Sequence, residues 1–382
     1  MKKLEDGRAL EVIREMCHNL LKWFEKNNYM GHDPYQIPRY EILSDTFFKY
    51  FPSPSLVFAF LPRLLIPEAL GLIIRANASL YKVFGNSFLI RKNSILIETL
   101  LDYLKESGYN GWGVPFKWKS GFGLTYPKDY PFAIVSAEIG HSLLDQYILT
   151  KQKRLLATSE RIAEFLLAEN GFLRIGNKIC FYYSSLDKYL VNNVNTYVAS
   201  FLIKLGYLKR LSRYFEIATK AIDYTLSQQN ADGSWYYYAY PFCRYVSTID
   251  NRHTGYTLVS LKWANAYLKS EKIQSSINSG WRFYKNNFLL NGTIPKHRID
   301  KIFPIDIHDA AQVILTSLEM GEPQIALATA KWVIENMSNK ENEFYFKMYR
   351  DGKVVRISSA RWSQAWMYRA LTFLLEKAVY MK

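Results

Sequence analysis

Residues 306–309, Asp306-Ile307-His308-Asp309, begin an apolar helical pattern directly after a polar residue, and four other segments of this sequence do the same. They are Glu138-Ile139-Gly140-His141, Asn192-Asn193-Val194-Asn195, Asn251-Arg252-His253-Thr254 and Ala360-Arg361-Trp362-Ser363. The steps from His141 to Asn195, His253, His308 and Trp362 are 54, 58, 55 and 54 residues. A spacing this regular predicts a repeated structural unit along the chain.

A second marker gives nearly the same period. Gly-containing turns with aromatic neighbours occur at Asn110-Gly111-Trp112-Gly113, Asn170-Gly171-Phe172, Asp232-Gly233-Ser234-Trp235 and Asn291-Gly292-Thr293. The steps from Gly111 to Gly171, Gly233 and Gly292 are 60, 62 and 59 residues. Each unit therefore consists of a helix, a short polar turn, a second amphipathic helix and a long aromatic link.

Twelve helices follow from this unit, near residues 5–28, 64–83, 88–107, 133–149, 154–169, 193–205, 208–228, 254–269, 273–288, 307–320, 323–337 and 362–378. We expect an all-α fold: an (α/α)6 toroid of six helical hairpins with short β-hairpin loops at one end, forming a single domain over residues 1–382. The last helix would pair with the first, because an open stack needs polar capping repeats and none is seen. An open α-solenoid is the alternative.

Composition limits the functional classes. The chain has 49 Lys and Arg against 34 Asp and Glu, a formal charge of +15, and the basic residues are spread along the sequence. Such a surface attracts anions, including acidic glycans and lipid headgroups. No dense basic patch or nucleic-acid-binding motif is present, so we expect no nucleic-acid partner.

Location and redox state follow from the cysteines and the apolar stretches. Cys17, Cys180 and Cys243 are too few and too far apart for a disulfide framework, and the N-terminus lacks the apolar run of a signal peptide. The most apolar stretch, Leu56 to Ile74, is interrupted by prolines and charges, which favours a buried helix over a membrane span. We expect a cytoplasmic protein, with peripheral contact to the inner face of a membrane as the alternative.

Ionisable residues recur where the inner helices begin. In a closed ring these positions converge, and we predict Asp306, His308 and Asp250 as catalytic groups, because carboxylates and an imidazole in a shared cavity can transfer protons. Asp306 also fits the role of a helix N-cap. His141 and His253 occupy the position of His308 in two other repeats. Without a local HxH or HxxxH spacing we expect neither a metal nor a cofactor.

Substrate contacts are predicted at the same end of the ring. We expect His253, His141, Asn195, Arg252 and Arg361 to bind substrate, with the two arginines orienting a carboxylate or phosphate. The aromatic links add candidate stacking surfaces for sugar rings, with Trp112 and Trp235 as the choices for direct contact. The alternative is that these aromatic side chains turn inward and seal the links onto the helices.

Two resemblances bear on function. The segment Gln229-Asn230-Ala231-Asp232-Gly233-Ser234-Trp235 resembles the QW repeat of terpenoid-cyclase and prenyltransferase toroids, and Asp306-Ile307-His308-Asp309 resembles the DxDD acid motif of class II terpene cyclases. The motif is changed here, since His308 stands where that family has its proton-donating aspartate. This resemblance implies an α/α toroid.

The second resemblance covers most of the chain. Trp112-Gly113-Val114-Pro115-Phe116-Lys117-Trp118, His253-Thr254-Gly255-Tyr256, His308-Asp309-Ala310-Ala311-Gln312 and Trp362-Ser363-Gln364-Ala365-Trp366-Met367 are similar to toroid proteins of bacterial and archaeal surface-polysaccharide biosynthesis clusters. The resemblance implies a six-hairpin, glycosidase-like fold shared with hydrolases, lyases and sugar epimerases.

The functional hypothesis combines these observations. We expect a protein that binds or acts on an acidic oligosaccharide or lipid-linked glycan in surface polysaccharide biosynthesis. Hydrolysis, elimination and epimerisation remain open as reaction types. The alternatives are a non-catalytic scaffold or glycan-binding subunit of an assembly complex, and a terpenoid-cyclase-like enzyme.

Overall fold

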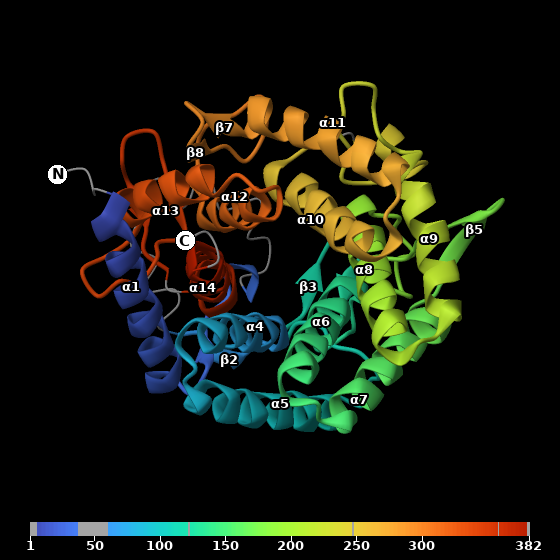
Figure 1. Ribbon diagram of the computed structural model, residues 1–382, viewed down its shortest axis with the longest axis horizontal. Helices are drawn as coiled ribbons and strands as arrows, with labels where there is room; N and C mark the ends of the chain where they lie inside the picture. The colour runs from blue at the N-terminus through green and yellow to red at the C-terminus, as the bar shows by residue number, and fades with distance from the viewer. Residues whose placement is uncertain (1–5, 37–59, 121–122, 247, 358, 380–382) are drawn as a thin grey trace.

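Two concentric rings of helices form the molecule, as Figure 1 shows. The computed structural model describes residues 6–36, 60–120, 123–246, 248–357 and 359–379. Within them the inner ring consists of α4 (Pro67–Phe84), α6 (Ala133–Thr150), α8 (Asn192–Lys209), α10 (Asn251–Leu268), α12 (Ile307–Glu319) and α14 (Trp366–Val379). The outer ring consists of α1 (Asp6–Lys26), α5 (Ser87–Ser107), α7 (Lys153–Glu164), α9 (Ser212–Leu226), α11 (Glu271–Phe288) and α13 (Pro323–Met337). The prediction of an (α/α)6 toroid is confirmed.

The ring closes between the first and last inner helices. Helix α14 packs directly on α4 and also contacts the outer helix α1. The hydroxyl of Tyr368 donates to Asn77 Oδ1 at 2.8 Å across this junction. Asn77 in turn donates to Asn93 Oδ1 at 2.9 Å, so a buried polar chain links α14, α4 and α5. Because both ends of the chain take part, the first and last inner helices of the described residues cover each other, as a closed ring requires.

Inner and outer helices differ in the way the sequence suggests. In α4 every residue from Ala69 to Leu80 is buried, whereas α5 buries only one stripe, with Leu89, Leu96 and Leu100 on it. A helix surrounded by neighbours must be apolar or small on all sides, while a covering helix needs one apolar face. Within the apolar stretch Leu56 to Ile74, the part from Ile66 onward thus belongs to the core, whereas Phe60 is 87% exposed and residues 56–59 lie outside the described residues. No helix in the described ranges is long and apolar enough to cross a membrane.

The links between hairpins carry short antiparallel strand pairs, as expected. They are β1 (Met30–Gly31) with β2 (Leu64–Leu65), β3 (Trp118–Lys119) with β4 (Thr125–Tyr126), β5 (Phe172–Ile175) with β6 (Lys178–Phe181), and β7 (Leu289–Leu290) with β8 (Ile294–Pro295). In a fifth, three-stranded sheet, β10 (Lys347–Met348) lies between β9 (Ile305–Asp306) and β11 (Val354–Val355). In these pairs Trp118 lies opposite Tyr126, Phe172 opposite Phe181, and Asp306 opposite Lys347.

Irregular helical turns flank two of the helices. A π-helical stretch, Phe165–Asn170, continues α7, and another, Ala360–Ala365, leads into α14. Single 3-10 turns occur at Pro34–Gln36 and Phe242–Arg244. The second π-helical stretch places Arg361 and Trp362 at the start of the last inner helix, and both residues belong to the site described below.

Glycines set the spacing of two inner helix pairs. A Cβ atom on Gly140 of α6 would lie 2.5 Å from the ring of Phe201 on α8, and one on Gly255 of α10 would lie 2.6 Å from Gln312 on α12. Phe201 is completely buried and has no space to move into. These helices can therefore approach closely only because those two side chains are missing.

We predict that Gly140→Ala lowers the free energy of unfolding by about 1–3 kcal/mol, because the added methyl group overpacks the α6–α8 contact. Gly71→Ala is the matched control, since its Cβ would lie 3.5 Å from Ile139, an ordinary contact, in another inner helix. The control should be neutral or stabilising by about 0.5–1 kcal/mol through helix propensity. Urea unfolding of both variants measures this, and equal effects would contradict the packing argument.

Candidate active site

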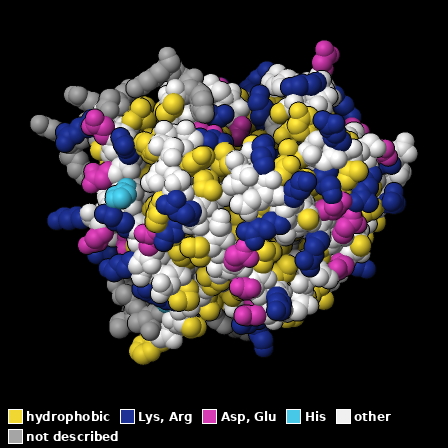
Figure 2. All heavy atoms as spheres, turned by 60° about the horizontal axis from the view of Figure 1, so that its bottom comes forward, with side chains coloured by type: hydrophobic (Ala, Val, Ile, Leu, Met, Phe, Trp, Pro, Cys, Tyr) yellow, Lys and Arg dark blue, Asp and Glu magenta, His cyan; other side chains and the backbone are white. Residues whose placement is uncertain are grey.

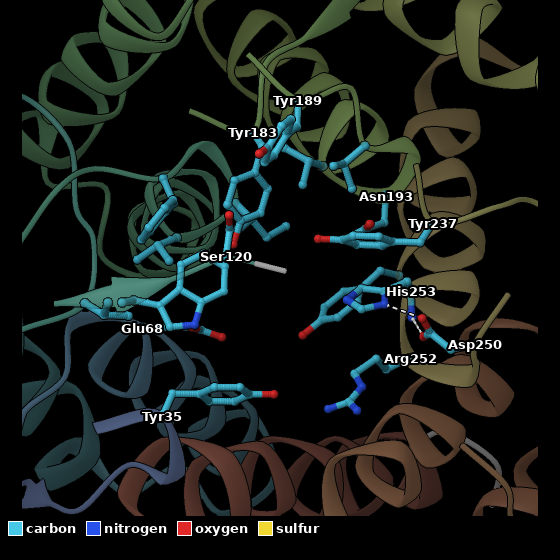
Figure 3. A pocket seen from close by; sticks show the side chains of 18 of the residues that line it. Tyr35, Glu68, Ser120, Tyr183, Tyr189, Asn193, Tyr237, Asp250, Arg252 and His253 are labelled. Atoms are coloured by element: carbon cyan, nitrogen blue, oxygen red, sulfur yellow. Dashed lines mark hydrogen bonds and ion pairs between the residues drawn. The ribbon is translucent and has the colours of Figure 1, made fainter. Parts of the chain in front are cut away.

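A cavity of about 370 Å³ lies where the inner helices begin, between the helix N-termini and the aromatic links. Every inner helix, or the turn that leads into it, contributes to the lining, through residues such as Glu68, Val135, Asn193, His253, His308 and Arg361. Figure 3 shows Tyr35, Glu68, Asn193, Tyr237 and His253 arranged around this space. The starts of the inner helices therefore converge on a polar, aromatic-rimmed cavity, as predicted.

The best-defined pair in the cavity is His253 with Asp250. Asp250 is the N-cap of α10, and one carboxylate oxygen accepts from the backbone N–H of His253 at 3.0 Å. The other oxygen lies 2.7 Å from His253 Nδ1, the contact dashed in Figure 3. Burial alone would raise the pKa of Asp250, but His253 outweighs this effect and holds it below its usual range. An ionised Asp250 fixes the Nδ1–H tautomer, which leaves Nε2 of the partly exposed imidazole as a base.

A second imidazole, that of His308 on α12, is more deeply buried than that of His253. Its Nε2 lies 3.0 Å from the hydroxyl of Tyr256, and its ring stacks on Trp366 and meets Trp362 edge-on. Burial lowers the pKa of His308 well below its usual value, and the nearby Arg252 and Arg361 act in the same direction. His308 is therefore neutral at pH 7.

Arg361 connects the chain termini at the cavity wall. Its guanidinium binds both carboxylate oxygens of Asp33, at 2.7 and 3.1 Å, and donates to Glu68 at 2.9 Å. Asp33 lies 328 residues earlier in the sequence, so this bidentate pair also holds the segment after β1 against the π-helical stretch that leads into α14. Coulombic attraction to Asp33 and Glu68 outweighs desolvation and raises the pKa of Arg361.

Arg252 occupies a similar place beside α12. It lies 3.4 Å from Asp309 and 3.8 Å from Asp306, and its guanidinium packs on Trp362. Asp309 also accepts from His297 Nδ1 at 3.0 Å. Desolvation would lower the pKa of His297, but the Asp309 carboxylate outweighs it and the net shift is upward. Both arginines are thus largely neutralised by carboxylates of the chain itself.

Several buried polar atoms around the cavity have no hydrogen-bond partner among the described residues. They include Nδ1 of His308, Oδ1 of Asn193, and Nε and Nη1 of Arg252. A buried polar group without a partner costs free energy, so these atoms are suited to a ligand that supplies the missing bonds. Within the described ranges no three His, Cys, Asp or Glu side chains are grouped as metal ligands.

Aromatic side chains form much of the remaining wall of the cavity. Trp118 stacks on Tyr126 at a centroid distance of 5.1 Å and packs near Tyr183, while Tyr237 lies 4.3 Å from the ring of His253. Burial raises the pKa of Tyr183 and of Tyr237 well above 10, so both phenols stay protonated and can donate to a ligand. The wall therefore combines apolar faces with fixed hydroxyl groups.

Five of the predicted site residues meet in this cavity: Asp250, Arg252, His253, His308 and Arg361. Asp306 lies behind these residues and does not line the cavity. It is the N-cap of α12, accepting from the backbone N–H of His308 and from the indole N–H of Trp362, each at 3.0 Å. Asp306 therefore has the contacts of a helix N-cap, which was the alternative considered for it. It positions His308 and Trp362, which line the cavity.

His141 does not join the other histidines. It is the ninth residue of α6, because 141 − 133 = 8, whereas His253 is the third residue of α10, because 253 − 251 = 2. The difference of six residues carries it roughly 9 Å further along its helix. There His141 is buried against Ser200 and the ring of Trp263. The segment around His141 has the spacing of the repeat, but it does not lie at the start of its helix.

Asn195, Trp112 and Trp235 are also buried away from the cavity. Asn195 accepts from the Phe181 N–H at 3.0 Å and donates to Ala221 O at 2.7 Å, which ties the β6 strand to α8 and α9. The indole N–H of Trp112 donates to Leu100 O, and that of Trp235 to Thr225 O, both at 3.0 Å. The two tryptophans seal links onto helices, as the alternative interpretation proposed.

Other lining residues were not singled out from the sequence. Tyr35 precedes the first inner helix, Glu68 lies in the predicted helix 64–83, where none of the quoted repeat markers falls, and His297 lies in a link. Tyr256 follows His253 by three residues, so one helical turn places both on the same side of α10. That i, i+3 spacing from a candidate imidazole is the signal that could have identified Tyr256.

We predict that the wild-type protein loses stability relative to His308→Gln as pH falls below about 6.5. The pKa of His308 is lowered on folding, so the unfolded state binds the extra proton and stability falls by up to about 1.4 kcal/mol per pH unit below that value. Denaturant unfolding between pH 5 and pH 8 measures the difference. His18→Gln on the exposed face of α1 controls for the loss of an imidazole; an unchanged difference across this range would contradict a neutral, buried His308.

Known structures share this architecture. A cellobiose 2-epimerase from Spirochaeta thermophila superposes with a TM-score of 0.63 at 10% identity, over 83% of this chain and 87% of that one. A family 88 glycosyl hydrolase from Bacteroides vulgatus gives 0.60 at 12% identity over 98% and 99%. A polysaccharide lyase gives 0.60 at 13% identity over 98% of both chains. No protein-family model matches the sequence, and no curated protein matches it. The chain thus has a six-hairpin, glycosidase-like (α/α)6 toroid fold.

Proposed function

We propose that this protein is a carbohydrate-active enzyme that epimerises a sugar by proton transfer at the carbon next to a carbonyl group. The observation that carries the proposal is the His253–Asp250 pair, which presents an oriented imidazole base to the cavity. Histidine is the side chain whose basicity suits proton abstraction near neutral pH.

Glycoside hydrolysis by a carboxyl pair is less well supported. That reaction needs one carboxylic acid kept protonated and a second carboxylate that acts as base or nucleophile. The carboxylates that line the cavity in the described residues are Glu68 and Asp250. Glu68 is ion-paired with Arg361 and Asp250 is bonded to His253, so neither is placed as a free acid.

The proposed reaction uses two proton carriers. His253 Nε2 takes the proton from the carbon, and the electron pair of that C–H bond moves toward the carbonyl, giving an enediolate. Tyr256 and His308, held 3.0 Å apart, form the second carrier, which hydrogen-bonds the developing oxyanion and returns a proton. Delivery of the Tyr256 hydroxyl proton to the other face inverts the carbon. The Tyr256 phenolate then regains a proton from the His253 imidazolium through solvent, so that no atoms are gained or lost overall.

The substrate class is a glycan end that fits a cavity of about 370 Å³. Sugar rings carry apolar C–H faces, for which Trp118 and Tyr237 provide aromatic surfaces. The chain's own carboxylates neutralise Arg252 and Arg361, which supports a neutral reducing sugar over the acidic glycan expected from the net charge. The unbonded Arg252 Nη1 is available for a substrate oxygen. Surface polysaccharide biosynthesis remains the proposed biological setting, on the sequence resemblance.

We predict that the enzyme exchanges one carbon-bound hydrogen of its substrate for deuterium in D₂O. Neutral reducing disaccharides and uronic-acid oligosaccharides should be incubated with the protein and followed by NMR for loss of the proton next to the carbonyl. His253→Gln should slow exchange by about 10²–10⁴-fold, because it removes the base. Asp250→Asn should also reduce the rate, since the imidazole loses its orienting partner.

His141→Gln is the matched control, because that buried histidine lies outside the cavity and its loss should leave the exchange rate near that of the wild type. Release of a reducing end without deuterium at carbon would contradict the proposal and indicate hydrolysis. Deuterium exchange that survives His253→Gln would remove His253 from the role of base.

A further inference from the structure

A second cavity of about 210 Å³ lies at the opposite end of the ring. It is lined by residues from the later parts of α4, α6, α8, α10 and α12, together with α14; among them are Arg75, His141, Lys204, Trp263, Glu319 and Arg369. The inner helices run in one direction, so a lining set drawn from their far ends places this distal cavity away from the candidate active site. Lys82, whose side chain is 39% exposed, stands at its rim.

Aromatic residues separate the two cavities. Between them is a narrow space of about 20 Å³ whose walls include Tyr197, Tyr256, Trp263 and Trp366. Tyr256 faces the active-site cavity as well, while Trp263 faces the distal one. A ligand in the distal cavity therefore does not touch the His253–Asp250 pair.

Most cations around the distal cavity already have a carboxylate partner. Arg75 binds Glu138 and Asp145, each at 2.9 Å, and Lys204 shares Asp145. Lys82 binds Glu376 at 2.8 Å. These pairs account for the charge of three of the four basic side chains in the lining.

Arg369 is the exception. It is only 7% exposed, its Nη1 donates to Ser79 Oγ at 3.2 Å, and its guanidinium packs 4.7 Å from the ring centre of Phe373. No carboxylate of the described residues forms an ion pair with it. Glu319 lines the same cavity, but its Oε1 accepts from the indole N–H of Trp263. The α14 dipole does not compensate Arg369 either, because the residue lies near the start of that helix and not in its last turn.

Asp145, Glu376 and Glu138 attract the Arg369 charge from beyond ion-pair distance, but desolvation outweighs them and lowers its pKa, so the cost of burying this guanidinium is only partly offset. Such a charge next to an open cavity is explained if an anion enters and binds it. We propose that the distal cavity is a binding site for a small oxyanion, a phosphate or carboxylate group, held by Arg369 with Ser79 and Lys82 as further donors. Guanidinium groups bind both kinds of oxyanion through paired N–H donors. The site is separate from the proposed epimerase function and does not depend on it.

Thermal unfolding of the full chain tests the proposal. Inorganic phosphate and citrate are added separately at millimolar concentration, against sodium chloride at the same ionic strength. Saturating binding should raise Tm by about 3 °C over chloride. A response to phosphate alone identifies a phosphate ligand, and one to citrate alone identifies a carboxylate ligand. No response to either overturns the proposal.

Variants locate the site. Arg369→Met should abolish the anion response and raise Tm in buffer without added anion, because it removes a buried charge that is only partly compensated. Ser79→Ala should weaken binding while the fold is retained, which gives a second readout if Arg369→Met folds poorly. Arg91→Met removes the same charge from the exposed face of α5 and should keep the full response. An anion response that persists in Arg369→Met assigns the anion to another site and overturns the proposal.

Discussion

The contact of Arg361 with Asp33 and Glu68 is the interaction on which both the ring and the cavity depend. Its partners lie 328 and 293 residues away, at the other end of the chain. A bidentate, buried pair of this kind is costly to break, since each partner would be left as an unpaired charge. Glu68 and Arg361 also line the cavity, so the contact that closes the toroid completes one wall of the site.

Much of the fold could be predicted because the repeat leaves two independent records in the sequence, the helix starts and the Gly-containing links. Predicted helix ends mostly fall within a few residues of those observed, as for 273–288 against Glu271–Phe288. The first residues of the last helix were less accessible, because a π-helical turn at Ala360–Ala365 shifts the side-chain pattern away from the usual period. Pairing of β9 with β10 could not be predicted, since it joins segments about forty residues apart.

Only part of the candidate site could be predicted from the sequence. Asp250 and His253 were found because they sit at a helix start, where an N-cap and its neighbours point to the same end of the ring. His141 was misplaced because apolar spacing fixes a helix face but not how deep a residue lies along the axis. Trp112 and Trp235 could not be distinguished from exposed stacking residues, because that depends on which face of a link turns inward. Glu68 and Tyr35 could be identified only through their three-dimensional contacts with Arg361 and Trp362.

The inner helices and the links contribute different kinds of side chain to the cavity. The inner helices carry the ionisable groups, including His253 and His308, while the links supply much of the aromatic wall, such as Trp118 and Tyr183. Helix positions are locked by close packing, whereas connecting segments accept insertions and exchanges readily. Sequence changes can therefore remodel the rim of the cavity while the ionisable groups on the inner helices keep their places, which makes the rim the more evolvable part of the scaffold.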